Sequence, residues 1–321
     1  MIICGPTGVG KTGFAIELAR RFSGEIVGAD SMQVYRRMDI GTAKPTAAEQ
    51  AAVTHHMVDI IDPGEDFDAA AYGRRAELCV TRLIEQGKLP FVVGGTGLYI
   101  KALLYGLAEA APADDKIRAQ LKAEMERTGP QAMHDRLSRV DPQSARRIHP
   151  NDAFRILRAL EVFQQTGRPI SAHHNGHRFS QVRYDALQIG LTLPRTRLYA
   201  RIDRRVDGML DRGLISEVRM LLDQGLDPRL KSMQSLGYRH IVDYLQGRRK
   251  WEETVSTLKR DHRRYAKRQM TWFGADAQVR WLQPDQFDRA VALINKFISG
   301  ATVNITADDP GGTQERICES D

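Results

Sequence analysis

The chain has 321 residues, of which 42% are hydrophobic and 27% charged, the balance of an ordinary globular protein. That length allows two or more core-forming units. No apolar run approaches the ~18 residues of a membrane-spanning helix and no secretory signal opens the chain, so we expect no membrane span. The three cysteines match no disulfide or metal spacing, which favours a reduced, cytoplasmic protein. The net charge of +7 indicates a polyanionic partner without naming it.

A phosphate-binding loop stands at the start of the chain. It has the pattern G-x-x-x-x-G-K-[ST] and consists of Gly5, Pro6, Thr7, Gly8, Val9, Gly10, Lys11 and Thr12. Such glycines let backbone amides point at anionic oxygens, while Lys11 adds a positive charge and the Thr12 hydroxyl is a candidate Mg²⁺ ligand. Only residues 1–4 precede the loop, so the first strand is expected to be short or to lack residues at its start.

Residues 1–110 alternate between strand and helix patterns. A short strand over 25–29 ends at Asp30, a long helix is predicted over 66–86, and a buried strand over 90–93 runs into Gly94-Gly95-Thr96-Gly97. This order predicts an α/β fold with a P-loop NTPase-like parallel sheet flanked by helices. Ligands bind at the carboxyl ends of such strands, so Asp30 and Thr96 should both reach the phosphate site. The strand over 90–93 lacks the terminal aspartate expected of a P-loop NTPase.

The sequence changes character near residue 111. Residues 111–178 are charged, helical and poor in strand signals, which predicts an all-helical insertion domain. A strand-like segment over 187–193 returns to the sheet, and long helical segments follow over 195–224 and 251–272. The catalytic core is therefore expected to comprise residues 1–110 and 179–299. Residues 300–321 are rich in Gly, Asp, Thr and Pro and are expected to form a disordered tail.

Basic residues gather in two places. In the run 259–268, one helical face carries Arg260, Arg264, Lys267 and Arg268. The second cluster comprises Arg136, Arg139, Arg146, Arg147, Arg155 and Arg158. Because aromatic residues lie near both clusters, they favour a nucleic-acid partner over a merely solvated surface. His55 and His56 have no third ligand at a suitable spacing, so we assign them a structural role instead of a metal site.

Several short motifs together resemble one protein family. They are residues 5–12, Asp30-Ser31-x-Gln33-Val34-Tyr35, Gly41-Thr42-Ala43-Lys44-Pro45, His55-His56-x-x-Asp59, Val93-Gly94-Gly95-Thr96-Gly97-Leu98-Tyr99, Asn151-Asp152-x-x-Arg155, Arg158-Ala159-Leu160-Glu161-Val162, Leu236-Gly237-Tyr238-Arg239 and Lys267-Arg268-Gln269-x-Thr271-Trp272-Phe273. Their order and spacing over residues 1–283 are similar to those of the tRNA dimethylallyltransferase family. Any one motif is a weak signal, whereas the ordered set is specific.

The resemblance implies transfer of a dimethylallyl group from dimethylallyl diphosphate to N6 of adenosine 37, beside the anticodon of tRNA. The adenine amine is a poor nucleophile because its lone pair is delocalised, so a carboxylate must orient it and take its proton. Asp30 is the candidate for that base. Lys11, the loop amides, Mg²⁺ on Thr12 and, by resemblance, Arg205 would stabilise the departing diphosphate.

The resemblance also implies which residues meet the RNA. The implied contacts are Asp30, Ser31, Met32, Gln33, Thr96, Arg118, Phe154, Arg155, Ile156, Leu157 and Arg158. The helical insertion would clasp the anticodon stem-loop, and the adenine would have to leave the loop stack to react. We therefore expect Mg²⁺ as the cofactor, tRNA and dimethylallyl diphosphate as partners, and a monomeric enzyme.

Two other interpretations fit parts of the sequence. A small-molecule or nucleotide kinase shares the phosphate-binding loop and Asp30, and would turn over ATP without needing the basic run 259–268. A non-catalytic RNA-binding P-loop protein would not need Asp30 at a strand end beside Lys11 and Thr12. Prenylation of unmodified tRNA in the presence of dimethylallyl diphosphate and Mg²⁺ would distinguish the three.

Overall fold

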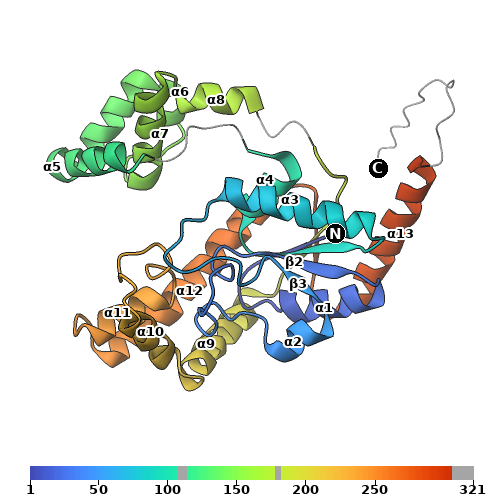
Figure 1. Ribbon diagram of the computed structural model, residues 1–321. Helices are drawn as coiled ribbons and strands as arrows, with labels where there is room; N and C mark the ends of the chain where they lie inside the picture. The colour runs from blue at the N-terminus through green and yellow to red at the C-terminus, as the bar shows by residue number, and fades with distance from the viewer. Residues whose placement is uncertain (108–113, 178–181, 306–321) are drawn as a thin grey trace, which may run out of the picture. The chain divides into compact units, whose positions relative to one another are not determined.

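The computed structural model describes residues 1–107, 114–177 and 182–305, which form two compact units (Figure 1). The first unit contains residues 1–67 and 75–100 and the described residues from 186 onward. The second contains residues 68–74 and the described part of 101–185. The helical insertion predicted for residues 111–178 falls within this second unit.

A six-stranded sheet forms the centre of the first unit. Its strands, in the order β3-β2-β4-β1-β5-β6, are β1 (Ile2–Cys4), β2 (Glu25–Ala29), β3 (His55–His56), β4 (Pro90–Gly94), β5 (Gln188–Leu191) and β6 (Val279–Leu282). All the pairings between these strands are parallel. The three-residue β1 is central, with Ile3 opposite Val93 on one side and Ile189 on the other. The predicted α/β parallel sheet is thereby confirmed.

Helices flank this sheet. α1 (Lys11–Arg21) and α3 (Ala69–Glu85) lie on opposite faces, as right-handed crossovers to either side require (Figure 1). Phe14 and Leu18 of α1 pack with Ile3, Ile189 and Ile294 in one apolar core. The other helices of this unit are α2 (Ala47–Ala52), α9 (Arg195–Asp211), α10 (Leu214–Asp223), α11 (Tyr238–Leu245), α12 (Trp251–Gly274) and α13 (Phe287–Ile305), and α4 (Gly97–Tyr105) begins here.

Two predicted boundaries differ from the structure. The helical segment expected over 195–224 is two helices, because Gly213 adopts a left-handed conformation with φ 94° between α9 and α10. Residues 300–305, which the sequence assigns to the tail, belong to α13, because this helix continues to Ile305. Residues 306–321, the rest of the predicted tail, lie outside the described residues.

The second unit is helical in its described part. Its principal helices are α5 (Asp115–Val140), α6 (Pro142–Ala145), α7 (Ala153–Thr166) and α8 (Ile170–His177). α5 is kinked at Gly129, which has φ 84° and precedes Pro130. Leu121, Leu137 and Leu160 share the apolar core of the unit. Across the described residues of both units, no helix is long and apolar enough to cross a membrane.

Candidate active site

The phosphate-binding loop joins β1 to α1 at the carboxyl edge of the sheet. Gly5 has φ 134°, and a Cβ atom there would lie 2.5 Å from the Leu191 carbonyl oxygen, so no larger residue fits. Lys11 Nζ donates to the carbonyl oxygens of Gly5 and Pro6, both at 2.9 Å. Gly10 caps α1 without a side-chain hydrogen bond, and the first-turn amides of a helix are natural anion ligands. The loop thus has the geometry of an anion site.

Three charged side chains meet beside this loop. Burial, followed by the neighbouring Arg205, lowers the pKa of Lys11 to about 8, and the carboxylate of Asp30 opposes that shift. Burial also lowers the pKa of Arg205, again against the effect of Asp30. Among the described residues, Arg205 Nε is buried without a hydrogen-bond partner. Two cations against one carboxylate make the site net positive, which favours a multiply charged anion.

Asp30 and Thr96 lie at the ends of adjacent strands, β2 and β4. Asp30 Oδ1 accepts hydrogen bonds from the amides of Met32 at 2.9 Å and Gln33 at 3.3 Å, which forms a turn closed by its own side chain. Thr96 Oγ1 accepts the amide of Ser31 at 3.0 Å. The structure therefore brings together the two strand-end residues that the sequence predicts to share a site.

One cavity of about 1330 Å³ collects these groups within the first unit. The predicted site residues on its walls are Thr7, Gly8, Gly10, Lys11, Thr12, Asp30, Ser31, Met32, Gln33 and Arg205. Thr96 connects to this wall through its hydrogen bond with Ser31. Gly5 and Pro6 supply the carbonyl oxygens that hold Lys11, whereas Val9 is fully buried in the core behind the loop.

A polar stripe on α12 also lines the cavity and was missed by the sequence analysis. It consists of His262, Tyr265 and Gln269. Gln269 links two loops, because its Oε1 accepts the amide of Thr7 at 2.8 Å and its Nε2 donates to the Gly95 carbonyl oxygen at 3.0 Å. The three- and four-residue spacing of the stripe is the signal that could have identified it. The arginines interspersed along α12 obscure that pattern.

Two members of this stripe remain uncharged near neutral pH. Burial lowers the pKa of His262 to about 4, and its Nδ1 lies 3.0 Å from the carbonyl oxygen of Leu258, so Nδ1 carries the proton. Burial and the nearby Asp30 raise the pKa of Tyr265 above its usual range, although a hydrogen bond with Thr96 opposes the shift. These side chains therefore offer hydrogen bonds, not charge, to a ligand in the cavity.

The basic run on α12 is partly neutralised within the protein. Lys259 pairs with Asp207 and Arg263 with Asp203, both at 2.6 Å. Arg264 is different, because its side chain is 63% exposed and its nearest carboxylate is 3.6 Å away. The uniform basic face expected from sequence is therefore divided between internal ion pairs and exposed arginines.

Asp261 is the centre of a charged cluster on the same helix. It accepts hydrogen bonds from Arg239 at 3.1 Å, from His240 at 3.2 Å and from Arg260 at 3.1 Å. Although burial opposes the change, the hydrogen bonds from Arg260 and His240 lower the pKa of Asp261 to about 2. Because the folded pKa lies below the unfolded one, this carboxylate stabilises the fold above about pH 4 and loses that effect as the pH falls toward 2.

We expect Asp261→Asn to lower the free energy of unfolding by about 2 kcal/mol at pH 6, with a smaller loss at pH 3. Urea unfolding of both proteins at several pH values between 3 and 6 measures the difference. Replacing the exposed Asp285 by asparagine is the matched control and should change stability little at any pH. A pH-independent difference for the Asp261 variant would contradict the assigned ion-pair role.

The helical unit holds the other predicted RNA contacts. Phe154 on α7 is 79% exposed, and Arg155 is exposed beside it. Ile156 has no exposed surface, because it shares the apolar stripe of α7 with Ala159 and Leu160. Its side chain therefore lies in the core of this unit, so the predicted contact of Ile156 with RNA would have to use its backbone.

Two further arginines of the predicted contact set belong to an internal ion-pair cluster. Arg118 and Arg158 both pair with the buried carboxylate of Glu161, at 3.1 Å and 2.9 Å. Leu157 is half-buried and packs against the apolar core of the unit. A buried carboxylate that binds two arginines fixes their direction, and an RNA phosphate would have to share them with Glu161.

His55 and His56 have protein partners. His55 Nδ1 lies 2.7 Å from the Val53 carbonyl oxygen, and His56 Nε2 lies 2.6 Å from a carboxylate oxygen of Glu25. Within the described part of the chain, no group of three or more His, Cys, Asp or Glu residues could hold a metal ion. The contact of His56 with Glu25 joins β3 to the neighbouring strand β2, whereas the contact of His55 is local.

A glycine-rich anion loop and a carboxylate at the carboxyl edge of a parallel sheet define a P-loop α/β enzyme with a polyanionic substrate. The protein-family model of the IPP transferases matches residues 33–276. The chain belongs to this family, the tRNA dimethylallyltransferases. Membership favours the prenyltransferase interpretation over a kinase.

Curated relatives match nearly the whole chain. The tRNA dimethylallyltransferase of Desulfosudis oleivorans is 52% identical over 299 residues, which cover 93% of this chain and 95% of that protein. The tRNA dimethylallyltransferase of Syntrophobacter fumaroxidans is 53% identical over 294 residues, which cover 92% of this chain and 86% of that protein.

Solved structures show the same fold. The tRNA isopentenylpyrophosphate transferase of Bacillus halodurans has a TM-score of 0.68 and 45% identity, with 93% of this chain and 95% of that chain covered. A eukaryotic dimethylallyltransferase acting on tRNA has a TM-score of 0.79 and 29% identity, with coverage of 93% and 79%.

Proposed function

We propose that this chain transfers a dimethylallyl group from dimethylallyl diphosphate to N6 of adenosine 37 in tRNA, releasing diphosphate. The observation that carries the proposal is the meeting of Asp30, Lys11 and Arg205 at one cavity in a member of the tRNA dimethylallyltransferase family. A base and two cations are what the transfer of an allylic group to a weakly nucleophilic amine requires.

Asp30 acts on the acceptor side of the reaction. Its Oδ1 is engaged by the amides of Met32 and Gln33, which fixes the carboxylate at the end of β2. A carboxylate held in one orientation can accept a hydrogen bond from the adenine amine and take its proton as the new C–N bond forms. Thr96, anchored to the amide of Ser31, supports the same wall of the cavity.

The phosphate-binding loop acts on the donor side. Its amides and Lys11 bind the diphosphate, and Arg205 approaches from α9 with a buried Nε that has no protein partner among the described residues. As the allylic C–O bond breaks, negative charge grows on the diphosphate, and fixed cations stabilise that charge without reorganisation. The low pKa of Lys11 fits this role, because an arriving anion favours the charged ammonium.

The cavity also suits Mg²⁺. The hydroxyl of Thr12 and the carboxylate of Asp30 are oxygen donors on its wall, and Mg²⁺ needs only one or two protein ligands when phosphate oxygens and water supply the rest. We propose that Thr12 holds the ion. When bound, Mg²⁺ offsets negative charge on the diphosphate.

The helical unit is proposed to bind the anticodon stem-loop. The exposed Phe154 offers a stacking surface, and the neighbouring Arg155 offers a charge for the backbone. The target adenine would leave the loop stack at a cost of a few kcal/mol, which is smallest in single-stranded loops. We also propose a monomer in the cytoplasm, a compartment that keeps free thiols such as Cys4 and Cys79 reduced.

The test is a direct assay of the product. The protein is incubated with labelled dimethylallyl diphosphate, Mg²⁺ and unmodified tRNA, and the tRNA is digested to nucleosides. The expected result is N6-dimethylallyladenosine, with none in a control that lacks tRNA. ATP hydrolysis or phosphorylated product without prenylation would favour the kinase, and RNA binding without any turnover would favour a binding protein.

Arg264→Ala is expected to weaken binding of all tRNAs similarly and to flatten the plot of log affinity against log salt by about one unit. The reason is that the exposed Arg264 is proposed to neutralise one phosphate and release its counterion. Titration of labelled tRNA at several salt concentrations measures the slope. Arg263→Ala is the matched control, because Arg263 already pairs with Asp203 at 2.6 Å and should leave the slope unchanged. A wild-type slope for the Arg264 variant would remove α12 from the proposed RNA surface.

A further inference from the structure

One wall of the cavity is a loop that the proposed chemistry leaves without a role. Residues 39–45 line the cavity next to Gln33, and the loop has little regular structure of its own. Ala43 has φ 46°, a left-handed conformation that costs a residue with a Cβ about 1 kcal/mol or more. Such a conformation persists only where surrounding contacts stabilise it. The contacts that stabilise this loop therefore indicate what the loop does.

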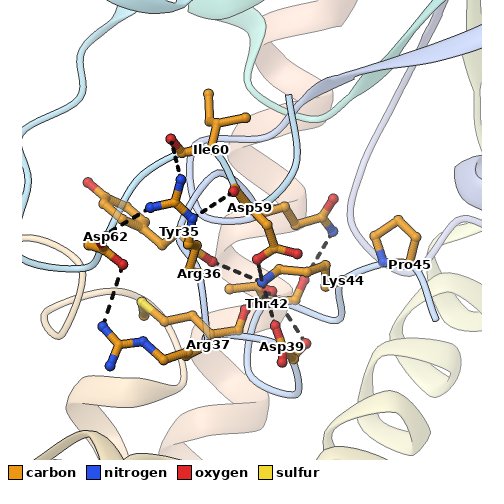
Figure 2. Close-up of polar contacts among 12 residues, drawn as sticks. Tyr35, Arg36, Arg37, Asp39, Thr42, Lys44, Pro45, Asp59, Ile60 and Asp62 are labelled. Carbon is orange, nitrogen blue, oxygen red and sulfur yellow. Dashed lines mark hydrogen bonds and ion pairs between the residues drawn. The ribbon is translucent and has the colours of Figure 1, made fainter. Parts of the chain in front are cut away.

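Lys44 holds the loop from inside. Its side chain is only 4% exposed, and its Nζ donates to the Tyr35 carbonyl oxygen at 2.9 Å and pairs with Asp39 and Asp59 (Figure 2). All three N–H groups of the ammonium are thereby used. Lys44 therefore acts as a clamp within the loop and has no donor left for a substrate.

Glu217 binds the backbone of the same loop. This residue lies on α10 and is 8% exposed, and its carboxylate accepts the amides of Asp39 at 2.9 Å, Ile40 at 2.7 Å and Gly41 at 3.0 Å. A fourth bond comes from the hydroxyl of Tyr238 at 2.5 Å. Burial and Glu217 raise the pKa of Tyr238 far above its usual range, so the hydroxyl keeps its proton and donates it.

The loop of residues 39–45 in turn fixes the side chain of Gln33. Gln33 Nε2 donates to the carbonyl oxygens of Thr42 at 3.2 Å and Ala43 at 3.1 Å. Two carbonyl acceptors fix which end of the carboxamide faces the loop, because only the NH₂ group can donate to them. The Gln33 carboxamide thus has one orientation at the cavity wall, with Oε1 as its remaining hydrogen-bonding atom.

We propose that Glu217 is a positioning residue for the RNA side of the active site. Glu217 binds three successive amides and so fixes the loop of residues 39–45. The carbonyl oxygens of Thr42 and Ala43 in that loop then orient Gln33 toward the RNA. The inference rests on the proposed function only in naming tRNA as the ligand. Glu217 has no proposed role in binding the prenyl donor, because its hydrogen bonds are to the loop of residues 39–45 and to Tyr238.

The test is a double-mutant cycle of Glu217→Gln and Gln33→Ala. Glutamine keeps the size of Glu217 but places an NH₂ group against backbone N–H donors. We expect Glu217→Gln to lower kcat/KM for tRNA by about 10- to 100-fold, the loss of one or two hydrogen bonds, with affinity for dimethylallyl diphosphate unchanged. In the Gln33→Ala background the same substitution should add less than about threefold, since coupled residues are not additive.

Controls separate this role from general destabilisation. The exposed Glu252→Gln is the matched substitution and should leave all constants unchanged. Tyr238→Phe removes one of four bonds to Glu217 and is expected to give a smaller loss, about 2- to 10-fold, with the same coupling to Gln33. If thermal unfolding shows that Glu217→Gln does not fold, Tyr238→Phe tests the positioning role in its place.

The two proposals fail in different ways. Wild-type protein that forms no N6-dimethylallyladenosine would refute the proposed function, and the cycle is then read from tRNA affinity alone. Losses that multiply across the cycle, or a parallel loss of donor affinity in Glu217→Gln, would overturn the positioning role while leaving the prenyltransferase activity intact. Coupled losses confined to tRNA would support it.

Discussion

Asp30→Asn is expected to lower the rate of prenyl transfer by about 10²- to 10⁴-fold, the usual contribution of a positioned general base. Asparagine is the sharper choice than alanine, because its Oδ1 can still accept the amides of Met32 and Gln33 and keep the turn. Only the negative charge and the basicity are lost. The effect should fall on kcat, with affinity for dimethylallyl diphosphate and for tRNA changed far less.

Single-turnover assays with saturating tRNA and donor measure this loss directly. Asp285→Asn is the matched control, because it makes the same substitution at an exposed position that does not line the cavity. A rate for Asp30→Asn within a few-fold of wild type would show that another group takes the proton. Tyr265, which contacts Thr96 on the same wall, would then be the next residue to test.

Arg205→Ala is expected to lower the rate by about 10²- to 10³-fold, as is typical when one group that stabilises developing charge is removed. The buried Nε of Arg205 has no hydrogen-bond partner in the part of the chain that the structure describes, which indicates a guanidinium held for an anionic ligand instead of for the fold. Its loss also leaves Asp30 opposite Lys11 alone, which removes one of the two cations that make the site positive.

Product inhibition isolates the cause of this second effect. We expect inorganic diphosphate to inhibit Arg205→Ala more weakly than wild type, while tRNA affinity at fixed salt stays the same. Arg204→Ala, at an exposed position of the same helix, is the control for a general change in charge. Unchanged inhibition by diphosphate, or a loss of tRNA affinity instead, would place Arg205 on the RNA side.

Both residues illustrate how much of the site the sequence could supply. The eight-residue phosphate loop is a local pattern, because its glycines, lysine and threonine are contiguous and need no distant partner to be recognised. Asp30 follows from the rule that parallel strands end at one edge of a sheet. Arg205, by contrast, is one arginine among several on α9, and only the resemblance to a family singled it out.

The helical faces were harder to predict. On α12 the sequence emphasises the arginines, yet His262, Tyr265 and Gln269 line the cavity, while Lys259 and Arg263 pair with α9. Periodicity shows that a helix has distinct faces but not what each one meets, because that depends on which distant element packs against it. Ile156 shows the same limit: a residue within a predicted RNA-binding segment turns into the core.

The sequence by itself determined the class of the fold, the place of the phosphate site and the family, since these depend on contiguous motifs and on the order of elements. The tertiary structure decided how the site is held. Glu217 binds the amides of Asp39, Ile40 and Gly41 from far along the chain and is itself held by Tyr238, and Gln269 bridges Thr7 and Gly95. A buried carboxylate or carboxamide must find its hydrogen bonds somewhere, but only the folded chain shows which amides supply them.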